Sequence, residues 1–323
     1  MIRVSVVVPT FERAARLPGL VAALEAQTLP RDEFEVIISD DGSSDETPQV
    51  LEDLRSRSGI DLRVERAPQN GGAAAARNLG WRAARAPVIA FTDDDCVPAP
   101  GWLEAGLAAL EASGAGIVQG RTLPDPSVRR EVGFWRSIAV EEFSNRYETC
   151  NIFYRIDVLR ETNGFDAGFR LGLQTGISEG EDMELGWRAR RLGVTGAFAA
   201  EALVHHAVTF PGLRFLLRSA FDVRNLATMV RRFPEMRKEI LFMRVFLARR
   251  HVAFLAALGG IAVAPFWLPA LALTAPYLGI WLGRPPRPVD KRSIIGKLAE
   301  VPFDVAIVSG LAVGSIRERT LIL

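Results

Sequence analysis

Strand and helix signals alternate five times between Arg3 and Gly120, and this alternation limits the folds that the chain can adopt. Each apolar run has the length of a buried strand, and the segments between the runs favour helices. The runs cover 3–8, 34–39, 62–66, 88–92 and 116–120, and the helical segments cover 14–27, 44–57, 73–84 and 102–112. Short strands joined by helices form mostly parallel sheets covered on both faces. We therefore expect a Rossmann-like α/β fold with a mostly parallel central sheet flanked by helices.

Carboxylates follow two of these strands at the point where each strand ends. Asp40-Asp41 follow the second run, and Asp93–Asp95 follow the fourth. In parallel sheets ligands bind beyond the carboxyl ends of the strands, so we expect both acidic stretches at one edge. Pro9, Thr10 and Glu12 follow the first strand and belong at the same edge.

Three neighbouring carboxylates repel one another and need compensation. Because side chains alternate along a strand, we expect Asp93 and Asp95 on the same side. Two hard oxygen ligands suit Mg²⁺ or Mn²⁺, which commonly also bind substrate phosphates. The alternative is an Asp-rich turn that caps a helix starting near Pro100. The sequence has no G-x-G-x-x-G or Walker A pattern, so phosphates would be held by metal and side chains.

Beyond residue 120 the pattern is less regular. We expect a strand at 149–154, a short helix at 157–161 and an amphipathic helix from Glu181 to Leu192 that Gly193 closes. Late strands at 195–200 and 203–204 precede His205-His206.

The overall composition excludes several classes of protein. The net charge of the 323 residues is +1, so it indicates no nucleic-acid partner. Two cysteines, Cys96 and Cys150, form neither a disulfide framework nor a zinc spacing, which indicates a reducing compartment. Ile2–Val8 is too short for a signal peptide and runs into Pro9. We therefore expect the catalytic part in the cytosol.

The C-terminal part has a different character. Residues 253–282 contain no charged side chain, a run longer than the ~20 apolar residues that span a bilayer. Basic segments at 214–250 and 284–292 flank it, which favours a membrane-associated region over a buried helical hairpin in a soluble domain. Three prolines inside it disfavour one straight helix, namely Pro265, Pro269 and Pro276. We expect a catalytic domain at 1–210 and a basic, apolar, helical region at 211–323.

Five short motifs occur in order over residues 3–206. They are Val7-Val8-Pro9-Thr10-Phe11-Glu12-Arg13, Ser39-Asp40-Asp41-Gly42-Ser43-Ser44-Asp45, Gly72-Ala73-Ala74-Ala75-Ala76-Arg77-Asn78, Asp93-Asp94-Asp95 and Gly180-Glu181-Asp182. Together they resemble the family 2 glycosyltransferases, which have the GT-A fold. The remainder resembles the membrane-associated tails of some members, less specifically.

The resemblance implies a donor site at the acidic edge. Pro9, Thr10 and Glu12 would line the nucleotide pocket, and Asp41 would accept from the N3–H of a uracil-type base. Asp93 and Asp95 would form an Asp-X-Asp element in which Asp95 binds the metal, with Asp94 on the donor side. Arg77 would offset the charge of the cluster, and His206, in preference to His205, would complete the metal site.

The resemblance also implies which residues remove the acceptor proton and which lie near the acceptor. Asp182 would be the general base, and Asn151 and Glu181 are assigned to the acceptor side. Structural alternatives remain for several positions: a plain turn at 40–42, a solvated Arg77, helix-capping acids at Glu181-Asp182 and a structural histidine pair. Processive members carry Gln-X-X-Arg-Trp after the base, whereas residues 188–192 read Arg-Ala-Arg-Arg-Leu, which favours single addition.

The expected function is inverting sugar transfer from a UDP- or dTDP-sugar to an acceptor hydroxyl, with Mg²⁺ or Mn²⁺. The expected acceptor is a lipid-linked or cell-envelope glycan precursor at the cytoplasmic face of an anionic membrane. One alternative is a sugar-phosphate nucleotidyltransferase, but residues 9–16 supply Arg13 and Arg16 without the glycine-rich loop that such enzymes usually need. The other is a non-catalytic sugar-nucleotide-binding protein.

Overall fold

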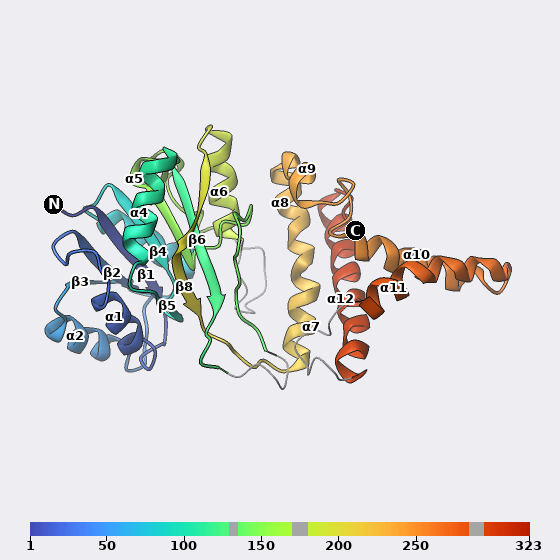
Figure 1. The fold of residues 1–323 in the computed structure, drawn as a ribbon, viewed down its shortest axis with the longest axis horizontal. Helices are drawn as coiled ribbons and strands as arrows, with labels where there is room; N and C mark the ends of the chain where they lie inside the picture. Colours follow the sequence, from blue (N-terminus) through green and yellow to red (C-terminus); the bar gives the residue numbers. More distant parts are fainter. Residues whose placement is uncertain (129–134, 170–179, 284–293) are drawn as a thin grey trace. The chain divides into compact units, whose positions relative to one another are not determined.

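The computed structural model describes residues 1–128, 135–169, 180–283 and 294–323, which form two compact units. The first unit holds the described residues up to 208, except 135–136. The second unit holds 135–136 and the described residues from 209 onward. Figure 1 shows an α/β first unit and a helical second unit.

An eight-stranded sheet forms the centre of the first unit, in the order β3-β2-β1-β4-β7-β6-β8-β5. Strands β1 to β4 are parallel where they pair, and β6 is parallel to β8. β7 runs antiparallel to β4 and β6, and β5 runs antiparallel to β8, so the sheet is mixed. The strands are β1 (Val4–Thr10), β2 (Phe34–Asp40), β3 (Asp61–Arg66), β4 (Val88–Thr92), β5 (Cys96–Pro98), β6 (Ile117–Pro124), β7 (Asn151–Arg155) and β8 (Gly196–His206).

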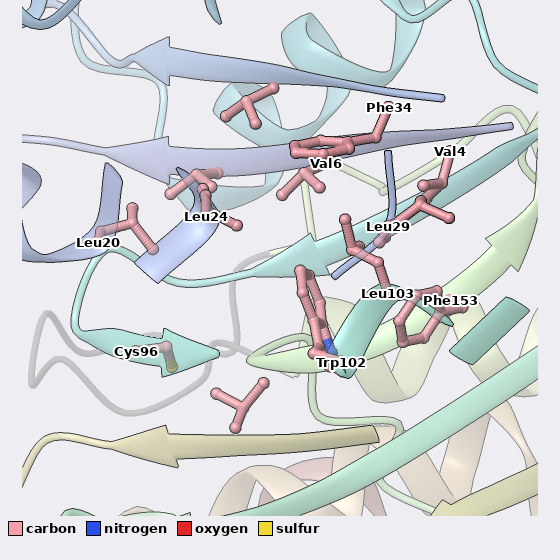
Figure 2. Packing of buried hydrophobic residues seen from close by; sticks show 14 of the residues in the cluster. Val4, Val6, Leu20, Leu24, Leu29, Phe34, Cys96, Trp102, Leu103 and Phe153 are labelled. Atoms are coloured by element: carbon pink, nitrogen blue, oxygen red, sulfur yellow. The ribbon is translucent and has the colours of Figure 1, made fainter. Parts of the chain in front are cut away.

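Apolar side chains from helices on one face of the sheet form the main core. Leu20 and Leu24 of α1 pack with Val4, Val6 and other alternate residues of the strands, as Figure 2 shows. Trp102 and Leu103, at the start of α4, extend the same cluster. The helices of this unit are α1 (Leu17–Glu25), α2 (Thr47–Arg57), α3 (Ala73–Ala83), α4 (Trp102–Ser113), α5 (Ile156–Thr162) and α6 (Glu181–Arg191).

Helix α3 lies very close to β1 and β2. A Cβ atom at Gly80 would lie 2.5 Å from both the Cγ1 atom of Val7 and the Oγ atom of Ser39, closer than real side chains approach. The glycine therefore permits this packing, which brings Arg77, one turn earlier on α3, to the carboxyl ends of the strands.

Two local predictions are corrected. Helix α2 begins at Thr47 and not at residue 44, because Ser43 and Ser44 bind Glu12 and the Asp45 carboxylate accepts from the Thr47 N–H over 2.9 Å. The two late strands expected after residue 194 are one strand, β8, whose pairing with β6 shifts register between Gly120 and Arg121.

The second unit contains the helices α7 (Leu213–Phe221), η1 (Asp222–Asn225), α8 (Leu226–Arg232), η2 (Pro234–Met236), α9 (Arg237–Ile240), α10 (Arg249–Val263), η3 (Leu268–Thr274), α11 (Ala275–Gly283) and α12 (Ile294–Glu318). Gly310 and Gly314 let α12 approach the backbone of Phe221 and Arg224. The charge-free run is divided among α10, η3 and α11, as its prolines predicted. Across the described residues, no helix has both the length and the apolar composition needed to cross a bilayer.

Candidate active site

Asp93, Asp94 and Asp95 occupy a turn between β4 and β5. β4 ends at Thr92, and the Cys96 N–H donates to the Asp93 carbonyl over 3.1 Å to close the turn. The strand alternation that we expected for Asp93 and Asp95 is therefore wrong. The three side chains diverge to three partners, which are Arg77, Thr10 and His206 respectively.

Thr10 links the ends of three strands. Its hydroxyl donates to the Oδ2 atom of Asp94 over 2.8 Å, and its carbonyl accepts from the Asp41 N–H over 2.9 Å. Burial raises the pKa of Asp94 to about 7, with the nearby Asp95 charge adding to the effect and the Thr10 bond opposing it. The buried Pro9 precedes Thr10 in β1, and the exposed Glu12 binds Ser43 and Ser44 just beyond it. The expected donor residues of β1 thus adjoin the acidic turn.

Asp41 is held by a glycine loop. Its two carboxylate oxygens accept from the backbone N–H groups of Gly71 and Gly72 at 2.9 and 2.7 Å. Gly42 has φ +76°, and a Cβ there would lie 2.8 Å from the Gln69 backbone, so only glycine fits. The sequence Asn70-Gly71-Gly72 predicted a turn, but its role in fixing Asp41 could not be read from the sequence.

Arg77 bridges two acidic segments that are distant in sequence. Its Nη2 atom donates to Asp93 Oδ1 and its Nη1 atom donates to Glu181 Oε1, both over 2.9 Å. Burial disfavours the charged guanidinium, but the charges of Asp93, Asp182 and Glu181 outweigh burial and raise the pKa of Arg77. The alternative of a solvated Arg77 is wrong, because its side chain is only 6% exposed.

Glu181 and Asp182 begin α6 and are both buried. Burial raises the pKa of Glu181 to about 8, the Asp182 charge raises it further, and Arg77 opposes the shift. Asp182 Oδ2 accepts from the Thr149 N–H over 3.2 Å and from the Thr149 hydroxyl over 3.1 Å. Thr149 lies just before β7, and no motif in the sequence marks it as a site residue.

Asp95 and His206 form the best metal-binding pair of the cluster. His206 Nε2 lies 3.5 Å from Asp95 Oδ1, whereas its Nδ1 lies 2.9 Å from the Ala207 carbonyl. A carbonyl only accepts, so Nδ1–H donates to it, and Nε2 is the nitrogen that a neutral His206 would offer to a metal ion beside the Asp95 carboxylate. A carboxylate oxygen suits both Mg²⁺ and Mn²⁺, whereas an imidazole nitrogen suits the softer Mn²⁺ better than Mg²⁺, so of the two expected ions the pair fits Mn²⁺ better. The donor set therefore fits the expected ion.

Cys96 and His205 contribute less to such a site. The Sγ atom of Cys96 lies within 4.8 Å of the ligand atoms of Asp95 and His206. Burial raises the pKa of this thiol well above its ordinary value, so it stays protonated and is a poor ligand. His205 precedes His206 in β8, where successive side chains point to opposite faces.

Asn151 does not belong to the acceptor side. Its side chain accepts from Trp102 Nε1 and donates to the carbonyls of Arg121 and Ala202. It is 1% exposed, so its carboxamide stabilises the sheet and cannot reach an acceptor. The sequence prediction for Asn151 is corrected accordingly.

A pocket of about 390 Å³ is formed by the segment that comes just before Thr149 in the chain. It is lined by residues between Ala139 and Glu148, among them Glu141, Glu142 and Ser144. The lining segment leads directly into Thr149, which binds Asp182. Its carboxylates and hydroxyl can hydrogen-bond a hydroxyl-rich ligand.

Comparison with known proteins adds a family signal. The family model described as "Glycosyl transferase family 2" matches residues 5–174. The chain is 28% identical to "Glycosyltransferase AglE" from Haloferax volcanii over 211 residues, which cover 63% of this chain and 66% of that protein. The matched region spans about half to two thirds of the length of AglE, of a validoxylamine A glucosyltransferase and of a pre-mycofactocin glycosyltransferase.

Solved structures share the fold. The mannosyltransferase PcManGT from Pyrobaculum calidifontis, in complex with GDP-Man and Mn²⁺, aligns with a TM-score of 0.58 and 18% identity over 98% of this chain and 87% of that chain. TarS 1-349 from Staphylococcus aureus, in complex with UDP, aligns with a TM-score of 0.52 and 17% identity over 99% of this chain and 92% of that chain. These likenesses confirm the expected GT-A-like fold.

Proposed function

The chain belongs to glycosyl transferase family 2, and from this premise we propose that it transfers a sugar from a nucleotide-diphosphate donor to an acceptor hydroxyl. The observation that carries the proposal is the Arg77 bridge. It joins the Asp93 turn, which we assign to the donor, to Glu181 beside Asp182, which we assign to the chemistry. Family membership favours this function over the nucleotidyltransferase and the non-catalytic binding protein.

We assign the nucleotide to the edge that contains Pro9, Thr10, Glu12 and Asp41. The bonds from Gly71 and Gly72 hold the Asp41 carboxylate in place, and a fixed carboxylate is an acceptor that suits a base N–H. Uracil and thymine present a donor at N3, which supports a UDP- or dTDP-sugar as substrate.

Asp95 and His206 would hold the divalent cation, and a bound Mg²⁺ or Mn²⁺ would supply positive charge for the departing diphosphate. Asp182 removes the proton of the acceptor hydroxyl as that oxygen attacks the anomeric carbon. The bond from the anomeric carbon to the diphosphate breaks at the same time, and the diphosphate leaves with the electron pair. Attack from the face opposite the leaving group inverts the anomeric configuration.

We place the acceptor near the pocket at 139–148, because its lining segment leads to the Thr149–Asp182 contact. The single-addition pattern after the base supports transfer of one sugar. We further propose that the acceptor is a lipid-linked or cell-envelope glycan precursor and that the protein works at the cytoplasmic face of an anionic membrane. The basic region before the charge-free run supports this location.

A donor titration tests the proposal. Binding of UDP, dTDP, GDP and CDP is measured by calorimetry with Mn²⁺ and again with EDTA. We expect UDP or dTDP to bind best and EDTA to weaken binding. CDP presents an acceptor at N3, so we expect it to bind at least about tenfold more weakly, the equivalent of one lost hydrogen bond to a charged group.

The metal assignment has a matched pair of variants. Asp95→Ala should lose the Mn²⁺-dependent part of donor binding, whereas Asp53→Ala, on the exposed side of α2, should keep it. Equal binding by Asp95→Ala with and without Mn²⁺ would remove the metal claim. Tight binding of CDP would remove the base assignment.

A further inference from the structure

The charge-free run forms an apolar arm, which we define as residues 252–283. It comprises most of α10, then η3 and α11, and Figure 1 shows it extending away from α12 within the second unit. Its turn exposes large apolar side chains: Phe266 is 92% exposed, Leu268 70% and Trp267 61%. Ile261 and Leu282 continue the exposed surface along both limbs. Soluble surfaces rarely carry so continuous an apolar patch.

The base of the arm is built differently from its tip. Phe254 and Ala257 of α10 pack with Tyr277 of α11 in a buried cluster. Arg250, just before the arm, binds Glu300 and Asp304 of α12, and all three are buried. The arm is therefore anchored to α12 by packing and by ion pairs, while its far end has no comparable cover among the described residues.

The two side-chain hydroxyls of the arm are both hydrogen-bonded. The Thr274 hydroxyl donates to the Leu271 carbonyl over 2.7 Å, and the Tyr277 hydroxyl donates to Asp304 over 2.5 Å. A segment that enters hydrocarbon must meet this condition, because lipid offers no hydrogen bonds.

We infer that the apolar arm inserts, turn first, into one leaflet of an anionic bilayer and does not cross it. The inference deepens the membrane location proposed above and rests on it. From Val252 to Val263 the first limb has twelve residues, or roughly 18 Å of helix. One leaflet holds about half of the ~30 Å hydrocarbon core, so the limb matches one leaflet and not two.

Charge near the base supports an anionic surface as the partner. Without the buried Arg250, the sequence between Arg214 and Arg249 has nine basic residues and three acidic ones. Arg244 and Arg249 are exposed and lie directly before the arm. Each basic residue held at an anionic surface strengthens binding about fivefold, which a second protein copy with the same charge would not provide.

Vesicle flotation tests the inference with the full chain. We expect the wild type to float with phosphatidylcholine vesicles that contain phosphatidylglycerol, and less with phosphatidylcholine alone. Phe266→Glu and Trp267→Glu should each reduce partitioning by about tenfold to a hundredfold, which is the value of burying one aromatic side chain. Leu192→Glu, at a half-exposed leucine of the first unit, should leave partitioning unchanged.

Cysteine labelling tests the depth of insertion. Leu268→Cys should react with an impermeant maleimide in solution and be protected on vesicles from reagent on either side. The native cysteines are buried and serve as an internal blank. Labelling by reagent trapped inside the vesicles would mean that the arm crosses, and would overturn the one-leaflet inference.

Two further outcomes would overturn the inference. One is flotation unaffected by Phe266→Glu and Trp267→Glu. The other is a dimer, seen by light scattering, that dissociates in these variants while the wild type ignores vesicles. UDP titration of the same samples separates failure of the arm from failure of the proposed sugar transfer, because the donor residues all lie in the first unit.

Discussion

Arg77 in the first unit and Arg250 in the second are both buried arginines that bind two carboxylates, yet their surroundings differ. Arg250 donates from Nε to Asp304 over 2.7 Å and from Nη1 to Glu300, and Tyr277 adds a donor to Asp304. Among the described residues, no buried polar atom of Arg250, Glu300 or Asp304 lacks a partner. We call this cluster closed, because each of its buried polar atoms has a hydrogen-bond partner.

The Arg77 cluster is not closed. The Nε atom of Arg77 and the Oε2 atom of Glu181 are buried without a hydrogen-bond partner in the described part of the chain. Asp93, Glu181 and Asp182 together exceed the charge of the one arginine, and burial raises the pKa of Glu181 to about 8. Perturbed acids and unsatisfied atoms concentrate where proteins bind ligands or perform chemistry.

An arginine bound to two carboxylates can therefore have a structural role, as in the second unit, or belong to a candidate functional site, as in the first. Where every buried polar atom has a partner, as at Arg250, the ion pairs hold helices together. Where buried polar atoms lack a partner in the described residues and a third carboxylate is present, as at Arg77, the cluster can respond to a cation, a substrate or a proton. The following predictions test this distinction.

The largest expected difference between variants of the two clusters is in the rate of sugar transfer. Asp182→Asn should reduce the rate of sugar transfer by about 10²–10⁴-fold, because an amide cannot take the acceptor proton. Donor binding by calorimetry should remain. Asp304→Asn, the matched change in the closed cluster, should keep the rate with a water-soluble acceptor. Wild-type turnover by Asp182→Asn would show that the base is another residue.

The second difference is in stability. Arg250→Met should destabilise the α10–α12 contact by about 3–5 kcal/mol, because it leaves Glu300 and Asp304 buried and uncompensated. Arg77→Met should cost less, because Asp93 is 23% exposed and Glu181 already tends to hold a proton.

Hydrogen exchange of α10 and α12, compared with α3 and α6, measures the two effects separately. Arg55→Met, in an exposed pair of α2, is the control and should change neither. A larger loss at Arg77 than at Arg250 would contradict our distinction between an open and a closed cluster.

The third difference is in pH dependence. The folded protein retains the Glu181 proton up to about pH 8, whereas the unfolded chain loses it near the ordinary value of 4.5. The stabilisation is therefore complete below that value and is lost as pH rises toward 8, with a slope of at most about 1.4 kcal/mol per pH unit. Denaturant unfolding of the donor-free protein should show this decline in the first unit.

Glu181→Gln should reduce the pH dependence, because the amide has no proton to lose, and the contribution of Asp94, whose pKa burial raises to about 7, should remain. Glu52→Gln should not reduce it, since its hydrogen bond to Arg55 lowers the pKa of Glu52 and places its titration outside the window. An identical slope in wild type and Glu181→Gln would assign the proton elsewhere.

The smallest expected effect concerns the support of Asp182. Thr149→Val removes one hydroxyl bond to its carboxylate and keeps the backbone one, so we expect a rate loss of about threefold to tenfold. The matched Thr162→Val, which removes a hydroxyl bond to the helix backbone, should leave the rate unchanged. Equal rates for both variants would show that the Thr149 hydroxyl does not position Asp182.

The sequence by itself determined the local elements and the chemical types at their ends. The bounds of β4 and the helical spacing of α1 follow from apolar periodicity, which acts over a few residues. The acidic strand ends follow from this periodicity and the residues that come after each strand, whereas the five motifs and Asp182 were identified by the resemblance to a family. The prolines that divide the apolar arm are read directly from the sequence.

Only the tertiary structure decided which of these groups meet. Arg77 and Glu181 are 104 residues apart, and Asp41 and Gly72 are 31 apart. The tertiary structure also buries the side chain of Asn151 and gives Asp93, Asp94 and Asp95 separate partners. Such contacts depend on how strands are ordered in the sheet, and that order comes from the packing of whole helices and strands, which local periodicity does not encode.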